Sequence, residues 1–262
     1  MRIATWNLDC RRAGRADLTR MTDLIRREDL DVLLLQEVRA GDMPVLSANT
    51  DDAVCSLDVQ RTDGHTSGQV GVAVLVRKGV RLDVGTADLL YGLHQPERGL
   101  SVTATWQGRP LSLLSWHAPN AAQHGRGAKA QAYVAVQTLW QSWTGLGIAG
   151  IDSNFPEDPV DLRAAEAIDQ RPEWRFQWDL LGPNPRHPLV DVTRQLLSVE
   201  PVDIPDAGPI ATTHRAGARN VRFDRLLVTP GITPHAVRHL YDDGIAAGSD
   251  HAMVCADVRL DG

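Results

Sequence analysis

The sequence predicts an α/β protein in which two β-sheets pack against each other with helices outside. Strand-length apolar runs recur along the chain, and several are almost continuously apolar, as expected for strands covered on both faces. Helical patterns lie between some of these runs, and no long linker, low-complexity tract or repeat interrupts the 262 residues. We therefore expect a single domain over residues 1–262.

The strands are predicted from the apolar runs themselves. We expect them at 2–8, 31–36, 70–77, 100–106, 111–117, 146–151, 221–229 and 251–260. Residues 79–111 contain several strand-length runs without a helical pattern, so this part of the chain predicts hairpins.

The helices are predicted from segments with one apolar face. The first is expected at 17–29, and its apolar face consists of Leu18, Met21, Leu24 and Ile25. Asp17 stands at its start as a candidate cap. A second helix is expected at 128–143 and a short third helix at 161–168.

The composition is that of a soluble globular protein, with 43% apolar and 23% charged residues. The net charge of −6 provides no overall attraction to nucleic acid, so such a substrate would need local arginines or bound cations. Cys10, Cys55 and Cys255 have no paired spacing, which predicts free thiols in a reducing compartment. No apolar run approaches the ~20 residues that span a bilayer. We expect a cytoplasmic monomer without a membrane partner.

Polar side chains stand at or just beyond the ends of several predicted strands. They are Asn7, Glu37, His117, Asn120, Asp152, Asn154, Asp224, Asp250 and His251. Each alone can be explained as a cap, a turn residue or a surface residue. Because ligands of α/β proteins bind beyond strand ends, the whole set predicts a polar site at one edge of the sheets.

The spacing of these residues adds two geometric predictions. Asp152 and Asn154 are two residues apart, so in an extended segment their side chains would project to the same side. Asp250 and His251 are adjacent, so they would face opposite sides and different partners.

Eight motifs, taken in their order along the chain, resemble those of the endonuclease/exonuclease/phosphatase superfamily, which includes AP endonucleases and pancreatic deoxyribonuclease. The motifs are "TWN", "LLLQE", "GVAVLVRK", "SWHAPN", "GIDSN", "LVDVTR", "FDRLLVTP" and "SDH". Any one of them is weak evidence, but the ordered set covers essentially the whole chain. The resemblance implies a four-layer α/β sandwich, with two mixed sheets face to face, that hydrolyses phosphate esters with Mg²⁺ or Mn²⁺.

The resemblance also implies roles for the metal-binding and substrate-binding residues. Glu37 would be the principal metal ligand, with Asp250 and Asn7 close by or bound through water. Asn120 matches an asparagine that the AP-endonuclease branch uses at the phosphate. A cation suits this chemistry because negative charge grows on the phosphate in the transition state.

The remaining residues of the set would be catalytic. Asp152 would orient or deprotonate the attacking water, and Asn154 would hold the nucleophile or a phosphate oxygen. His251, hydrogen-bonded to Asp224, would contact the scissile phosphate. His117 would stabilise the transition state or protonate the leaving oxygen.

Three positions depart from the usual family pattern. Ser153 replaces an aromatic residue in the turn after Asp152, and His214 stands where an aromatic residue often follows a threonine. The segment "FDR" at 223–225 is closer to the pancreatic nuclease form. None of these departures removes a catalytic group, but each bears on the substrate.

We favour a nuclease that acts on DNA or RNA. The candidate contacts to the nucleic-acid backbone are Arg11, Arg12, Arg15, Arg126, Lys129, Arg215 and Arg219. The alternative is a phosphatase or phosphodiesterase for a small molecule or lipid headgroup, which suits the acidic composition. A non-catalytic binding protein is a third possibility, but no catalytic residue is missing.

Overall fold

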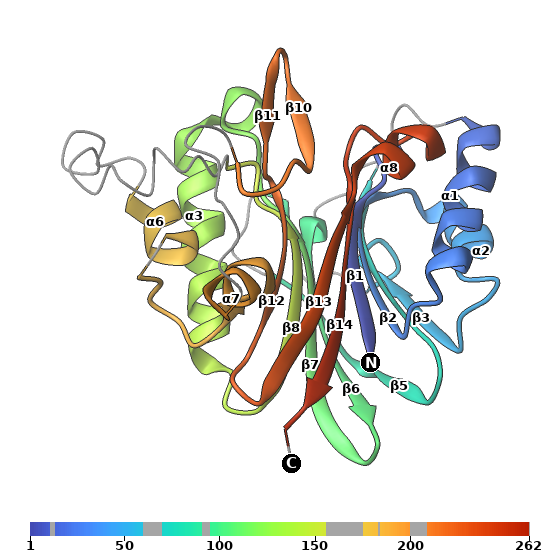
Figure 1. The fold of residues 1–262 in the computed structure, drawn as a ribbon, viewed down its shortest axis with the longest axis horizontal. Coiled ribbons are helices and arrows are strands. Elements are labelled where there is room, and N and C mark those ends of the chain that lie inside the picture. Colours follow the sequence, from blue (N-terminus) through green and yellow to red (C-terminus); the bar gives the residue numbers. More distant parts are fainter. Residues whose placement is uncertain are drawn as a thin grey trace.

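The computed structural model describes residues 1–10, 14–59, 70–90, 95–155, 175–182, 184–199 and 209–261. The helix expected at 161–168 lies outside these ranges, as do Arg11 and Arg12. The described elements form two mixed β-sheets packed face to face with helices on their outer faces (Figure 1). The fold class expected from the sequence is thus confirmed.

The first sheet has the strand order β13-β14-β1-β2-β4-β3. In this sheet β1 and β2 are parallel, and the other described pairs are antiparallel. Its strands are β1 (Arg2–Asn7), β2 (Val32–Val38), β3 (Asp52–Cys55), β4 (Gly71–Val76), β13 (Ile232–Leu240) and β14 (Met253–Leu260).

The second sheet has the order β5-β6-β7-β8-β12-β9, and here β7 and β8 form the parallel pair. Its strands are β5 (Val80–Leu89), β6 (Gly99–Trp106), β7 (Arg109–His117), β8 (Leu146–Asp152), β9 (Val190–Asp191) and β12 (Asp224–Val228). β5, β6 and β7 pair as consecutive antiparallel strands, which confirms the hairpins predicted at 79–111.

Helices cover the outer face of each sheet (Figure 1). The first sheet is covered by α1 (Arg15–Glu28), α2 (Met43–Leu46) and α8 (Tyr241–Ala247). The second is covered by α3 (Ala121–Ser142) and α6 (Arg175–Leu181), while α7 (Val192–Val199) contacts β12 and β13. Two single 3-10 turns, η1 (Ala40–Asp42) and η2 (Pro96–Arg98), lie in the connections. No helix among the described residues has the length and apolarity needed to cross a bilayer.

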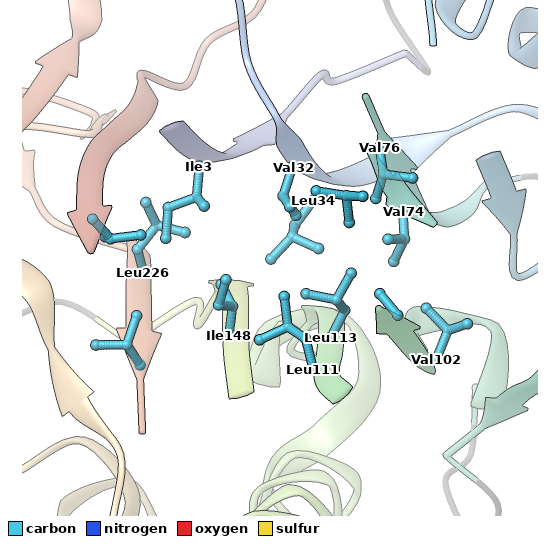
Figure 2. Close-up of a cluster of buried hydrophobic side chains, with 14 of the residues drawn as sticks. Ile3, Val32, Leu34, Val74, Val76, Val102, Leu111, Leu113, Ile148 and Leu226 are labelled. Atoms are coloured by element: carbon cyan, nitrogen blue, oxygen red, sulfur yellow. The ribbon is translucent and has the colours of Figure 1, made fainter. Parts of the chain in front are cut away.

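Strand alternation explains the layers. Val32 and Leu34 of β2 point into the core between the sheets, whereas Leu33 and Leu35 point outward to the helices. Both sides are buried, so these strands are continuously apolar in sequence. Figure 2 shows the inner layer, where Leu34 lies across from Leu113 and Ile148 of the second sheet.

Three local predictions need correction. The strand predicted at 221–229 is two strands, because β11 (Arg219–Val221) ends before Arg222 and pairs with β10 (His214–Ala216) as a separate hairpin. The N-cap of α1 is Gly14, and Asp17 lies three residues later, where its carboxylate accepts from the Gly14 amide at 2.7 Å. Helix α3 begins at Ala121, earlier than expected, with Asn120 as its cap.

Candidate active site

The polar strand ends meet at one edge of the sandwich. The strands β1 and β2 run parallel in the first sheet, and so do β7 and β8 in the second, so each pair delivers its last residues to the same edge. In the register, His117 lies opposite Asp152, and Asp224 lies opposite Asp152 from the other side. Asp152 is therefore at the centre of the group.

Asp152 is buried and receives hydrogen bonds on both carboxylate oxygens. The Asn7 side-chain amide donates to Oδ2 at 2.9 Å, and the Asn154 backbone amide donates to Oδ1 at 2.9 Å. The imidazole Nε2 atoms of His117 and His251 lie 3.4 and 4.0 Å from Oδ2. Burial opposes ionisation of Asp152, but the charges of His251 and His117 and the two amide hydrogen bonds outweigh it and lower its pKa.

His251 forms a buried pair with Asp224. The distance between His251 Nδ1 and Asp224 Oδ2 is 2.8 Å. Burial would lower the pKa of His251, but the carboxylates around it, above all Asp224, raise the pKa to about 10. Burial raises the pKa of Asp224, against the opposing effect of His251. The backbone at His251 is also fixed, because the Trp6 indole donates to its carbonyl at 3.1 Å and its amide donates to Ser249 Oγ at 3.0 Å.

His117 contacts residues of both sheets. It also contacts an arginine that the sequence analysis did not single out. Its Nδ1 is 3.7 Å from Glu37 Oε1 of the first sheet, and the side-chain nitrogen Nδ2 of Asn154 lies 3.1 Å from its Nε2. Arg98, from η2, places Nη1 3.3 Å from both ring nitrogens of His117 and is itself buried. The segment "QPERGL" contains no polar strand end, so nothing in its pattern pointed to the site.

Glu37 reaches the site because β2 is irregular there. The pairing of β2 with β4 shifts register between Gln36 and Val38, and Glu37 has a left-handed backbone with φ of 54°. Gln36 consequently points between the sheets while Glu37 lies at the site edge beside His117.

Asn154 meets its predicted neighbours through a turn rather than an extended strand. Its φ is 46°, in the left-handed region that asparagine tolerates, and β8 has already ended at Asp152. The predicted juxtaposition with Asp152 is present, but the strand alternation from which it was inferred does not apply.

The prediction that Asp250 and His251 face different partners holds in part, because His251 Nδ1 pairs with Asp224 whereas the Asp250 carbonyl lies 3.0 Å from His214 Nδ1. β14 begins only at Met253, so strand alternation does not apply at these positions either. Asp250 Oδ1 lies 3.7 Å from His251 Nε2, the same nitrogen that faces Asp152.

The donor atoms in this site fit a hard divalent cation. Carboxylates of Glu37, Asp152 and Asp250 surround the two imidazoles, and oxygen is the donor that Mg²⁺ prefers. Both polar atoms of the Asn7 side chain already have hydrogen-bond partners. Its Nδ2 donates to Asp152, and its Oδ1 accepts from the Asp9 backbone amide at 3.0 Å. It fits the orientation of Asp152 better than direct ligation.

A second candidate metal-binding group contains two histidines, but its geometry is unfavourable for binding one shared ion. His214, Asp250 and His251 place three donor atoms within 4.8 Å of one another. The rings of His214 and His251, however, are stacked, with centroids 4.4 Å apart and planes at 26°. The lone pair of each ring nitrogen lies in the plane of its own ring, and in stacked rings these planes do not meet at one ion. The contact between the two histidines is therefore ring packing. Sequence reasoning noted His214 only as a departure from the family.

The predicted substrate contacts are placed as follows. Asn120 Oδ1 accepts from the Ala122 amide at 2.9 Å and caps α3 next to His117. Arg126 is exposed on α3, just after the non-helical Gly125, and Arg215 is exposed on β10. The side chain of Arg15 is not described. Lys129 is buried and donates to the Asn154 carbonyl at 2.6 Å, so it is not a surface contact.

Comparison with known proteins identifies the class of fold. The model of the Endonuclease/Exonuclease/phosphatase family matches residues 4–251, and this chain belongs to that family. No curated protein matches the sequence.

Solved structures share the fold at low sequence identity. A humanised D. rerio TDP2 carrying 14 mutations has a TM-score of 0.69 at 15% identity, covering 99% of this chain and 98% of that one. D. rerio TDP2 complexed with single-strand DNA product has a TM-score of 0.63 at 16% identity, with the same coverage of 99% and 98%. An AP endonuclease from Archaeoglobus fulgidus has a TM-score of 0.67 at 17% identity, covering 99% and 100%.

Proposed function

We propose that this protein is a divalent-metal-dependent phosphodiesterase that acts on nucleic acid as a nuclease. The observation that carries the proposal is the arrangement around Asp152. A buried carboxylate is held by two amides, and two imidazoles, one at the end of β7 and one in the segment before β14, stand beside one of its oxygens. This is a base together with groups that stabilise charge, as an in-line attack on a phosphate requires.

The chain's own groups divide the work as follows. Asp152, kept ionised by its neighbours, orients the attacking water and accepts its proton. His251 is a cation at neutral pH because of Asp224, and its Nε2 contacts the scissile phosphate. His117 and Asn154 stand together beside Asp152, where His117 stabilises the transition state or protonates the leaving oxygen and Asn154 holds the nucleophile or a phosphate oxygen.

Glu37 and Asp250 are the residues that would hold the metal ion. A bound Mg²⁺ or Mn²⁺ would neutralise charge on the phosphate. The Glu37 carboxylate lies 3.7 Å from His117 and the Asp250 carboxylate lies 3.7 Å from His251, so an ion on either carboxylate would lie beside a histidine that is proposed to act on the phosphate.

Two observations support nucleic acid as the substrate. Exposed arginines, Arg126 and Arg215, flank the site from α3 and β10, and arginine suits bidentate contacts to phosphates. Proteins with the same fold include one complexed with single-strand DNA product and one AP endonuclease. The net charge of −6 favours the alternative, a phosphatase or phosphodiesterase for a small phosphate ester.

The test is a parallel assay of plasmid DNA, single-stranded DNA, RNA, abasic duplex, bis-(p-nitrophenyl) phosphate and the monoester p-nitrophenyl phosphate, with Mg²⁺, with Mn²⁺ and with EDTA. We expect metal-dependent cleavage of at least one nucleic acid. Asp152→Asn is the matched inactive control and should lower turnover about 10²-fold or more. Cleavage of the small diester alone would contradict the nuclease, and hydrolysis of monoesters only would favour the phosphatase.

A further inference from the structure

Helix α3 makes two direct hydrogen bonds to the turn that follows Asp152. The Tyr133 hydroxyl donates to the Ser153 carbonyl at 2.5 Å, and the Lys129 ammonium donates to the Asn154 carbonyl at 2.6 Å. The two donors are four residues apart on the helix, so they lie on the same face one turn from each other. Both side chains are buried.

The position of Lys129 is unusual for a lysine. Lysine is almost never buried without a partner, because desolvation of its ammonium is costly. Here burial lowers the pKa of Lys129 to about 8. Its ammonium lies 5.8 Å from the ring centroid of Tyr133 and 6.0 Å from that of Phe155, so aromatic faces surround it and the Asn154 carbonyl accepts from it.

The turn that these donors reach is the one with an unfavourable backbone. Asn154 has a φ of 46°, which costs free energy in any residue with a side chain. In this conformation the Asn154 backbone amide donates to Asp152, and the Asn154 side chain meets the His117 ring and donates to the Ala118 carbonyl. A relaxed, extended turn would move the Asn154 side chain away from His117.

We propose that Lys129 and Tyr133 are positioning residues that hold the catalytic turn 152–155 in its left-handed conformation. They act through Asn154 and do not touch the substrate. The proposal rests on the proposed phosphodiesterase function, since it assigns the two residues to the placement of Asp152 and Asn154 in that reaction.

The test uses Tyr133→Phe and Lys129→Met, which remove one donor each and keep most of the side-chain volume. Phenylalanine retains the edge-to-face contact of Tyr133 with Trp116, whose ring centroid lies 5.1 Å away. The control is Gln131→Met, an exposed position on the same helix. We expect kcat to fall about tenfold to a hundredfold in each variant with KM changed less than about twofold, because small misplacements of reacting groups are costly.

Two readouts separate positioning from general loss of structure. The backbone amide of Asn154 donates to Asp152, so hydrogen exchange at this amide should accelerate in both variants and not in the control. The double variant should lose less activity than the product of the two single losses, since both donors hold one turn.

The outcomes distinguish this proposal from the function on which it rests. An inactive wild type on every phosphodiester would contradict the proposed function. An active wild type whose kcat is unchanged in Tyr133→Phe and Lys129→Met, with Asn154 exchange also unchanged, would overturn the positioning role. A rise in KM alone would overturn it too, because it would indicate substrate contact.

Discussion

At the scale of single residues, the site depends on charges that are buried next to each other. Asp224 has no exposure, and its carboxylate lies 2.8 Å from the His251 ring. Removal of one partner of such a pair leaves the other buried and uncompensated. The proton on His251 is therefore sensitive to Asp224.

The first prediction concerns Asp224→Asn and pH. The pKa of His251 is raised from 6.5 to about 10, so its contribution to stability is full below pH 6.5 and is lost as pH rises through about 10. In metal-free buffer the unfolding free energy of the wild type should fall over this window, by at most about 1.4 kcal/mol per pH unit. Asp224→Asn should reduce that fall and lower the midpoint of the His251 titration, measured by NMR, because Asp224 is the strongest of the carboxylates that raise this pKa.

Asp88→Asn is the control, because Asp88 is exposed on β5. It also removes one negative charge but should leave the pH dependence unchanged. A His251 midpoint that stays near 10 in Asp224→Asn would show that another group sets it.

The second prediction concerns Glu37→Gln. The amide keeps the shape of the side chain but removes the charge next to His117, so metal affinity should weaken more than turnover at saturating metal. The Mg²⁺ concentration for half-maximal activity should rise at least about tenfold, and calorimetric binding of Mn²⁺ should weaken in parallel. Unchanged titrations would show that Glu37 is not a metal ligand.

At the scale of elements, the hairpin β10–β11 is tied to the site at both of its ends. His214, which opens β10, forms a bridge with His251 and stacks on the rings of both His251 and Phe223. Thr213 Oγ1 accepts from the amides of Phe223 and Asp224. Residues 215–220 of the hairpin are exposed, and the hairpin protrudes beyond the sheets (Figure 1).

The third prediction concerns this hairpin. Arg215→Ala combined with Arg219→Ala should raise KM for nucleic acid and leave kcat nearly unchanged. The slope of log Kd against log salt should decrease by up to about two, one unit for each lost phosphate contact. Arg259→Ala is the control, because Arg259 is exposed near the far end of β14. An unchanged salt slope would remove the hairpin from the substrate interface.

At the scale of the whole molecule, the two sheets are joined next to the site by a buried glutamine. Gln36 Nε2 lies 3.0 Å from Ser115 Oγ and 3.3 Å from the Gly150 carbonyl, both in the second sheet. A side chain at Gly150 would meet Leu34 and Thr5 of the first sheet at 2.7 Å, so only glycine permits this approach. These contacts fix how the two sheets align near the site. The alignment brings Glu37 of the first sheet next to His117 of the second.

The fourth prediction concerns Gln36→Leu. The substitution fills similar volume but leaves Ser115 and the Gly150 carbonyl without this donor, at a cost of about 1–3 kcal/mol in unfolding free energy by urea titration. Activity should fall as well, because the sheets that carry Glu37 and Asp152 lose their connection. Gln137→Leu on the outer helix α3 is the control and should change neither quantity. Full stability in Gln36→Leu would show that the apolar layer alone aligns the sheets.

The sequence predicts regular elements and residue types better than local backbone. Buried strands such as β1, β2 and β8 are nearly continuous apolar runs, and each carries a polar residue of the site at its end or one residue before it. The single domain, the monomer and the residue roles remain predictions. The failures fall where the chain leaves regular structure: the turn at Asn154, the segment before β14 and the break at Arg222.

Those failures have a physical reason. A left-handed residue or a break in a strand depends on partners that are far away in the chain. Asn154 has such a partner in Lys129, which donates to its carbonyl. Arg222 has one in Asp191, because the Arg222 guanidinium donates to the Asp191 carboxylate at 2.7 Å. Periodicity describes only neighbours in sequence, so it cannot include them. Arg98 was missed for the same reason, because only the folded chain brings it to His117.

The pairing of β14 with β1 has a consequence for folding. β14 lies between β13 and β1 in the first sheet, and the residues directly before it are Asp250 and His251. Strands that are this far apart in the chain pair only after a long loop has closed, which makes such contacts slow to form. The same long-range pairing that completes the first sheet therefore also completes the candidate site.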